Sequence, residues 1–156
     1  MKQLKYAFAA ACALSLTAPA LSQAPTVAVL DSLVPLSGTW TYRPIAGGSE
    51  AAFVDASAAR RLVIRCNRAA RTVSIVRTAV ATAAPTLSVW TTSGSRAIPS
   101  RFEATKVLTA DIAATDPFLD SIAFTRGSFA TAAASAPMLA VPAWPQPARV
   151  IEDCRS

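Results

Sequence analysis

"RRLVIRCNRAARTVSIVR", residues 60–77, holds six arginines, one cysteine and no acidic residue. On an extended chain, every second side chain points to the same face. One face here holds Leu62, Ile64 and Cys66, which is the period-two pattern of a half-buried strand. Residues 67–70 suit a tight turn because asparagine tolerates turn conformations, and alternation resumes at residues 73–77. The stretch therefore predicts a β-hairpin with Cys66 facing inward and most of the arginines facing solvent.

The arginines of this hairpin have two interpretations. They form the solvated side of the sheet, where charge also discourages pairing between sheet edges. Alternatively, Arg65, Arg68 and Arg71 form a site for an anion. We prefer the first interpretation and keep these three residues as candidates for binding.

Working outward, the same alternation or a weaker form of it recurs along the rest of the chain, in residues 38–44, 50–56, 85–92, 96–104, 105–114, 128–135 and 138–144. One short helix is expected at about 116–126, with Asp116 as its N-cap and Pro117 in its first turn. Residues 145–154 are expected to be an irregular tail because of Pro145 and Pro147. The pattern predicts a mostly β fold: a small antiparallel barrel or sandwich of six to eight strands with one short helix.

The first residues resemble an export signal. Lys2 and Lys5 precede an apolar run of thirteen residues, Tyr6 to Ala18, which is too short to span a bilayer. We expect a signal peptide at 1–22, cleaved between 20 and 24, then a loose lead at 23–37 and a single β-rich domain at 38–156. An uncleaved anchor and lipidation of Cys12 are the alternatives. The expected location is periplasmic or secreted, with no membrane span once the signal is removed.

Two cysteines, Cys66 and Cys154, remain after signal cleavage. An even number of cysteines in an exported chain predicts a disulfide. The alternative, a metal site, would lack its usual ligands because two isolated cysteines with no histidine are a poor set. We therefore predict that the bond ties the C-terminal segment to the hairpin.

The composition removes many catalytic possibilities. The chain has no histidine, which excludes the Ser-His-Asp triad and the Cys-His dyad. It also lacks a phosphate loop, a dinucleotide fingerprint and a nucleophile elbow. Asp111, Asp116 and Asp120 could gather around calcium, but a helix cap and surface charges explain them as well. We expect no catalytic residue, no metal and no cofactor, with an enzyme that uses carboxylates or a serine as the alternative.

Two resemblances bear on function. "DPFLDSIAFTRGSFA" (116–130) and "LAVPAWPQPARVIEDCR" (139–155) resemble small exported proteins of alphaproteobacteria, which implies export without a particular activity. "IRCNRAARTVSIVRT" (64–78) and then "VWTTSGSR" (89–96) resemble periplasmic lysozyme inhibitors of the small β-barrel type. That resemblance implies a loop at Ser93, Gly94 and Arg96 that enters an enzyme cleft, although Ile98 and Pro99 stand where those inhibitors usually have a tyrosine. Trp90, beside this loop, is a separate candidate anchor for a ligand or partner.

The predicted function is that of an exported, non-enzymatic β-domain that binds a protein or an anionic envelope component. Without Lys2 and Lys5 the formal net charge falls from +6 to +4, which favours anionic partners. Nucleic acid is not expected because the interleaved aromatic and basic residues of a single-strand platform are missing. The alternatives are a structural subunit of an envelope assembly and an inhibitor of a secreted hydrolase.

Overall fold

The computed structural model describes residues 27–156 except residues 104 and 135. The predicted signal peptide, its cleavage region and Cys12 lie outside these residues. The elements in chain order are α1 (Val27–Ser32), β1 (Gly38–Ile45), β2 (Gly48–Asp55), β3 (Arg60–Asn67), β4 (Thr72–Arg77), β5 (Thr86–Thr91), β6 (Gly94–Glu103), β7 (Val107–Ala113), α2 (Phe118–Ala123), β8 (Ser128–Ala133), β9 (Ala136–Pro142) and α3 (Pro145–Arg155).

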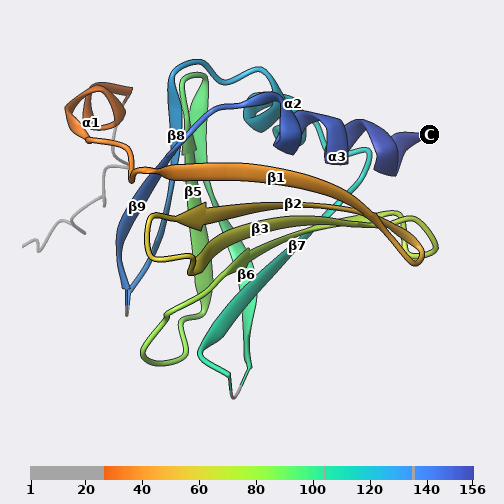
Figure 1. Ribbon diagram of the computed structural model, residues 1–156, viewed down its shortest axis with the longest axis horizontal. Coiled ribbons are helices and arrows are strands. Elements are labelled where there is room, and N and C mark those ends of the chain that lie inside the picture. Colours follow the sequence, from red (N-terminus) through yellow and green to blue (C-terminus); the bar gives the residue numbers. More distant parts are fainter. Residues whose placement is uncertain (1–26, 104, 135) are drawn as a thin grey trace, which may run out of the picture.

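The described strands belong to one antiparallel sheet in the order β1-β2-β3-β4-β7-β6-β5-β8-β9. The sheet curls into a half-barrel, and α2 and α3 lie together across one end of it (Figure 1). The mostly β, antiparallel prediction is confirmed. The expected six to eight strands and one helix are too few, because the described residues form nine strands and three helices.

The opening stretch forms the expected hairpin. In β3, Leu62, Ile64 and Cys66 are buried while Arg65 is exposed, so the alternation reports the inner face correctly. The turn between β3 and β4 is held by the Asn67 side chain, whose Oδ1 accepts a hydrogen bond of 3.1 Å from the Ala70 N–H. The inner face of this hairpin is one wall of the main core.

The last segment, residues 145–155, corrects the prediction of an irregular tail. It is the helix α3, which begins at Pro145. Proline is tolerated in a helical first turn because the N–H groups there have no partner within the helix. Beyond the prolines, α3 buries Val150, Ile151 and Cys154 against the sheet.

The disulfide prediction is confirmed: Cys66 on β3 and Cys154 on α3 are bonded, with their Cα atoms 5.3 Å apart. Both cysteines are buried, at 1% and 2% exposure. The bond joins residues 88 positions apart and fixes α3 on the inner face of the sheet. Tyr42 adds to this attachment, because its hydroxyl donates a hydrogen bond of 2.7 Å to Oδ2 of Asp153.

The expected loose lead, residues 23–37, also contains regular structure, since 27–32 form α1. Leu30 of α1 packs with Trp90, Ala130 and Ala140 in a small second core on the outer face of β5, β8 and β9. Local sequence gives little sign of this helix because the sheet surface beneath it supplies the apolar contact.

Candidate functional site

The three arginines proposed for anion binding do not converge. Arg65 points outward from the middle of β3. Arg68 lies at the hairpin turn, where its Nε donates a hydrogen bond of 3.2 Å to the backbone oxygen of Asp153. Arg71, exposed at the same turn, has φ = 50°. Of the predicted set, only Arg65 therefore belongs to a larger charged cluster.

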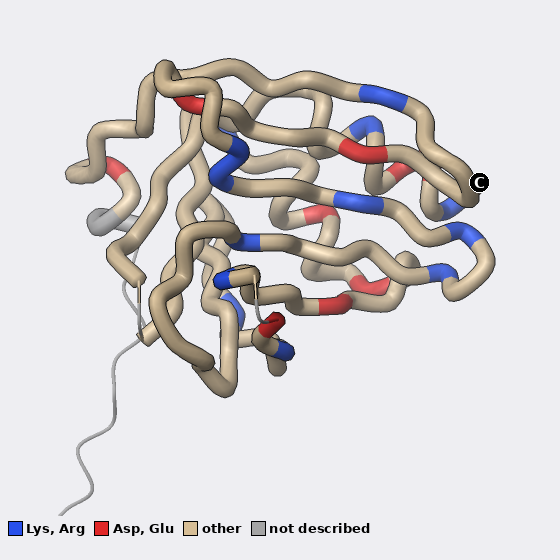
Figure 2. Tube along the Cα trace, turned by 60° about the horizontal axis from the view of Figure 1, so that its bottom comes forward, with Lys and Arg blue, Asp and Glu red and all other residues tan. Residues whose placement is uncertain are grey.

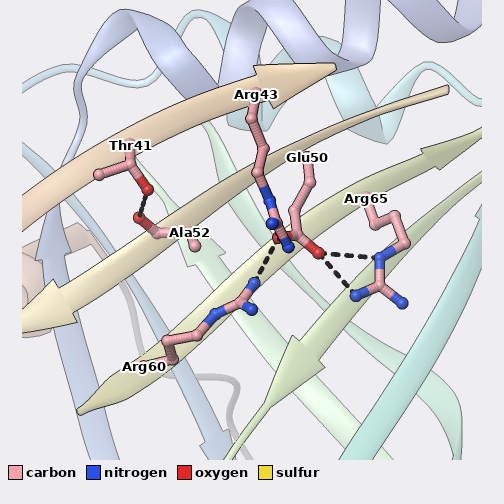
Figure 3. Close-up of polar contacts among 6 residues, drawn as sticks. All are labelled: Thr41, Arg43, Glu50, Ala52, Arg60 and Arg65. Carbon is pink, nitrogen blue, oxygen red and sulfur yellow. Dashed lines mark hydrogen bonds and ion pairs between the residues drawn. The ribbon is translucent and has the colours of Figure 1, made fainter. Parts of the chain in front are cut away.

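That cluster is centred on Glu50 of β2, whose residue exposure is only 1%. Arg43, Arg60 and Arg65 converge on its carboxylate from β1 and β3 (Figure 3). Oε1 accepts hydrogen bonds from Arg43 Nη2 at 2.8 Å and from Arg60, and Oε2 accepts from Arg65 Nη2 at 2.6 Å. We call these four residues the Glu50 cluster; its three cations and one anion leave two formal positive charges.

Strand register explains how the cluster assembles. Arg43 lies opposite Glu50 across the β1–β2 pair, and Glu50 lies opposite Arg65 across the β2–β3 pair. The same row continues through Ser74 on β4 to Asp111 on β7. Directly opposed residues of opposite charge stabilise a sheet, and Figure 2 shows positions of opposite charge on neighbouring strands.

The electrostatics of Glu50 argue against a role as a base. Burial raises the pKa of its carboxyl group, but the hydrogen bonds from Arg65 and Arg43 and the charge of Arg60 outweigh that effect. The net pKa therefore lies below the ordinary value of 4.5. A carboxylate that already accepts charged hydrogen bonds on both oxygens has a weak tendency to take a proton, and Glu50 holds three arginines around it.

The arginines keep outward-facing donors. The side chains of Arg43, Arg60 and Arg65 are 61%, 42% and 49% exposed. A guanidinium has five N–H donors, and Glu50 uses two from Arg43, one from Arg60 and two from Arg65. The remaining donors can bind carboxylate, phosphate or sulfate oxygens in the plane of the group.

Beside the cluster lies a hollow of about 300 Å³ on the outer face of β3, β4, β7 and β6. Valines and hydroxyl side chains line it between charged residues. We call it the outer hollow; its lining residues are Arg60, Val63, Arg65, Ser74, Val76, Thr78, Arg101, Glu103, Val107 and Thr109. Three arginines, Arg60, Arg65 and Arg101, and one acid, Glu103, are among these residues, and Glu50 and Asp111 pair with the arginines from beside the hollow.

Sequence reasoning missed Arg43, Arg60, Glu50 and Arg101 as members of this site. Arg101 lies across the β6–β7 pair from Thr109 and bonds Asp111. A usable signal was present, because Arg43 and Glu50 flank a turn at equal distances and so face each other in a hairpin. The strand order that brings Arg101 to the same face was not readable from local patterns.

The loop proposed by resemblance is a tight turn between β5 and β6. Ser93 and Gly94 are exposed, and the Thr91 hydroxyl donates a hydrogen bond of 2.9 Å to the Gly94 carbonyl oxygen. Arg96 pairs with Asp116 at 2.7 Å and lies over the ring of Phe118. Arg96 is therefore engaged in holding α2.

Trp90 is buried, whereas an anchor for a ligand or partner would have to lie at the surface. Its side chain lies in the second core, and the residue is only 9% exposed. Trp90 is therefore a packing residue rather than a surface contact. The exposed tryptophan is Trp144, at 41%.

The three aspartates considered for calcium lie apart, each with its own arginine. Asp111 pairs with Arg101, Asp116 with Arg96 and Asp120 with Arg155. Asp116 was the predicted N-cap, but that position belongs to Pro117; the Asp116 Oδ1 accepts a hydrogen bond of 2.8 Å from the N–H of Phe118, the first residue of α2. Within residues 27–156 without 104 and 135, no group of three or more metal-ligating side chains is gathered.

Comparison with known proteins adds no relative: no family model, curated protein or solved structure matches this chain. In the part of the chain that the structure describes, no helix has the length and hydropathy needed to cross a membrane. The buried Cys66–Cys154 bond is compatible with an exported protein, since disulfides persist in oxidising compartments.

Proposed function

We propose that this chain is an exported, non-catalytic binding domain that holds an anionic envelope component in its outer hollow. The location is periplasmic or secreted, as the signal-like first residues and the disulfide both favour. The observation that carries the proposal is the outer hollow itself, which joins exposed arginine donors to a floor of valines.

The hollow combines two kinds of attraction. Arg60 and Arg65 enter it from β3 and Arg101 enters it from β6, so its rim carries fixed positive charge on three side chains. Val63, Val76 and Val107 provide apolar surface between them. A ligand that bears phosphate, carboxylate or sulfate next to a short apolar part matches this arrangement better than a purely polar ion does.

Glu50 pre-organises the cationic side of the hollow. Because Arg60 and Arg65 are already held by hydrogen bonds to the buried carboxylate, less side-chain freedom is lost when a ligand binds. The same bonds occupy the carboxylate, which supports a binding role over acid–base catalysis.

Binding assays with two probes test the proposal. The protein, purified as it accumulates in the cell, is titrated with vesicles containing phosphatidylglycerol and separately with inorganic polyphosphate, with phosphatidylcholine vesicles as the neutral reference. Vesicle binding alone indicates a lipid headgroup, and polyphosphate binding alone indicates a soluble polyanion. A protein that binds neither of the two anionic probes would overturn the proposal.

A matched pair of variants distinguishes the hollow from general charge. Arg65→Gln/Arg101→Gln removes two arginines that line the outer hollow, whereas Arg68→Gln/Arg71→Gln removes two from the hairpin turn. We expect the first variant to bind at least about tenfold more weakly, since each hydrogen bond to a charged group contributes about 1.5 kcal/mol or more, and the second to bind nearly as well as the unchanged protein. Equal losses in the two variants would refute a specific site.

A further inference from the structure

A second surface shares no residue with the outer hollow, and it is apolar. The large hydrophobic side chains that are exposed among the described residues are Val34 at 90%, Phe124 at 75%, Trp144 at 41% and Leu36 at 38%. They come from three segments: the link between α1 and β1, the end of α2, and the link between β9 and α3. We call these four residues the apolar end.

Backbone contacts bring the three segments together. The Leu36 N–H donates a hydrogen bond of 2.9 Å to the Ala140 carbonyl oxygen near the end of β9. The Ala143 N–H donates a hydrogen bond of 2.9 Å to the Gly127 carbonyl oxygen. This bond connects the residue just before Trp144 to the segment that follows Phe124. The segments that carry the exposed apolar residues therefore lie next to one another.

A hollow of about 270 Å³ lies in the same region, between the α1–β1 link and the start of β8. Leu30, Leu33 and Pro35 line one side, and Arg126 lines the other together with Gly127 and Ser128. Asp31 lines it as well. Asp31 and Arg126 are both exposed, and the described residues provide neither of them with an ion-pair partner within 4.0 Å.

We propose that the apolar end is a two-fold interface between two copies of this chain, in which Asp31 of each copy pairs with Arg126 of the other. A two-fold interface brings the same patch of both subunits together, so the patch must complement itself. This patch does so, because it offers one acid and one base of opposite charge beside aromatic surface. Exposed Phe and Trp are among the side chains that contribute most at protein interfaces when they become buried.

The charge pair also favours this occupant over a partner that is uniformly acidic or uniformly basic. An acidic or a basic partner would leave either Asp31 or Arg126 facing like charge, which weakens binding. A second copy satisfies both residues at once, and it does so twice because of the two-fold symmetry. The pairing is independent of the outer hollow and does not require the proposed ligand.

Sedimentation equilibrium of the purified protein tests the interface. We expect a monomer–dimer equilibrium, and we expect Phe124→Ser and Trp144→Ser each to raise the dissociation constant by about tenfold or more, as for interface aromatic residues elsewhere. Thr115→Ser, at an exposed position between β7 and α2, serves as a surface control. A protein that stays monomeric up to about 1 mM, or dimers that are indifferent to both aromatic substitutions, would overturn the proposal.

Charge reversal identifies the pair across the interface. Asp31→Arg and Arg126→Asp should each weaken self-association by about tenfold or more, because each variant dimer would hold two like-charge contacts. A mixture of the two variants should form mixed dimers as stable as the original. In such a dimer the two introduced side chains meet each other as an ion pair, and the two original side chains form the second pair. A mixture that associates no better than the separate variants would rule out the proposed pairing, and unchanged thermal unfolding of both variants checks that they are folded.

Discussion

The indole Nε1 of Trp40 donates a hydrogen bond of 2.8 Å to the carbonyl oxygen of Pro142, 102 positions farther along the chain. The bond joins β1, one edge of the curled sheet, to the end of β9, the other edge. The Trp40 ring also packs against Phe53 and Phe129, with ring centroids 5.5 Å and 6.1 Å away. This tryptophan therefore helps to close the half-barrel across its open side.

Trp40→Phe should destabilise the protein more than Trp90→Phe. Both tryptophans are buried, but the Trp90 Nε1 has no hydrogen-bond partner among the described residues while the Trp40 Nε1 has one. Trp40→Phe should lower the free energy of unfolding by about 2–3 kcal/mol, because it removes apolar volume and the indole hydrogen bond to the Pro142 carbonyl oxygen, which keeps its bond from the Trp144 N–H. Trp90→Phe loses similar volume but also removes an unpaired donor, so we expect a loss about 1 kcal/mol smaller.

Urea unfolding followed by circular dichroism measures both free energies. The critical result is which of the two variants has the lower free energy of unfolding. If Trp90→Phe proved the more damaging change, the hydrogen bond between Trp40 and Pro142 would not be the contact that closes the sheet.

The disulfide should contribute a large part of the stability. Cys66→Ala/Cys154→Ala removes a cross-link between positions 88 residues apart. In the chain-entropy treatment such a loop accounts for about 4–5 kcal/mol of the free energy of unfolding. We expect the double variant to unfold at a much lower urea concentration, as should the unchanged protein after complete reduction. A difference below about 1 kcal/mol between the double variant and the oxidised protein would contradict this account.

The hairpin at residues 60–77 shows what local sequence predicts well. On β3, Leu62, Ile64 and Cys66 are buried on one face, whereas the other face is exposed at Arg65 and Asn67 and buried at Val63. The alternation is still visible, and the inward position of Cys66 follows from it. The same logic predicts α2, although the helix runs only from Phe118 to Ala123 rather than over 116–126, and its N-cap is Pro117 rather than Asp116. Each of these features depends on neighbours that are close in the sequence.

The misjudged segments depend on partners far away in the sequence. Pro147, Val150, Ile151 and Cys154 recur with the i, i+3, i+4, i+7 spacing of a helical apolar face, but the two prolines concealed that signal. The helix α1 is six residues long and depends on the sheet beneath it. Short helices gain most of their stability from tertiary packing, so their sequences alone predict them poorly.

The candidate site was only partly predictable for a related reason. Arg65 was identified as a charged outward position, but its partners Arg43 and Glu50 come from another hairpin. Which arginine faces which acid depends on strand order and register, and a shift of one residue would move every side chain to the other face. Arg68 and Arg71, which are close to Arg65 in sequence, lie at the turn and do not share its site.

Acid should weaken the fold in part through Glu50. Its folded pKa lies below the ordinary 4.5 because the arginine hydrogen bonds and charge outweigh burial. Above about pH 5 the group is charged in both states and its stabilising effect is complete. As the pH falls below 4.5, the unfolded chain takes up the proton first, so the contribution is lost progressively until the pH passes the folded pKa.

Glu50→Gln tests this dependence. The variant should be less stable at pH 7 by about 3 kcal/mol, because three arginines lose their buried counter-charge. It should also lose less stability than the unchanged protein between about pH 5 and pH 3, since the titrating group is gone. Glu103→Gln, with half of the side chain exposed, is the control and should retain the original pH profile. Identical profiles for the Glu50 variant and the unchanged protein would refute the assignment.

Arg77 presents the opposite case, a buried cation without a carboxylate partner among the described residues. It is 5% exposed and faces inward from the end of β4. Nη1 donates to the Arg61 carbonyl oxygen at 3.4 Å and Nη2 to that of Pro137 at 3.3 Å, whereas Nε has no partner in the described part of the chain. Burial and the charge of Arg61 lower the pKa of Arg77 to about 10, so the group still carries its charge at neutral pH.

Arg77→Met should therefore leave the protein as stable as before or stabilise it by about 1–2 kcal/mol. Methionine keeps much of the length and apolar stem, while the unfavourable burial of an uncompensated charge disappears. The carbonyl oxygens of Arg61 and Pro137 each lose a long hydrogen bond, which limits the increase in the free energy of unfolding. Urea unfolding of Arg77→Met beside Ile75→Ala, a neighbouring inward position on β4 that should lose about 2–4 kcal/mol, gives the comparison. A loss in Arg77→Met as large as that in Ile75→Ala would show that the link from β4 to Pro137 outweighs the burial of charge.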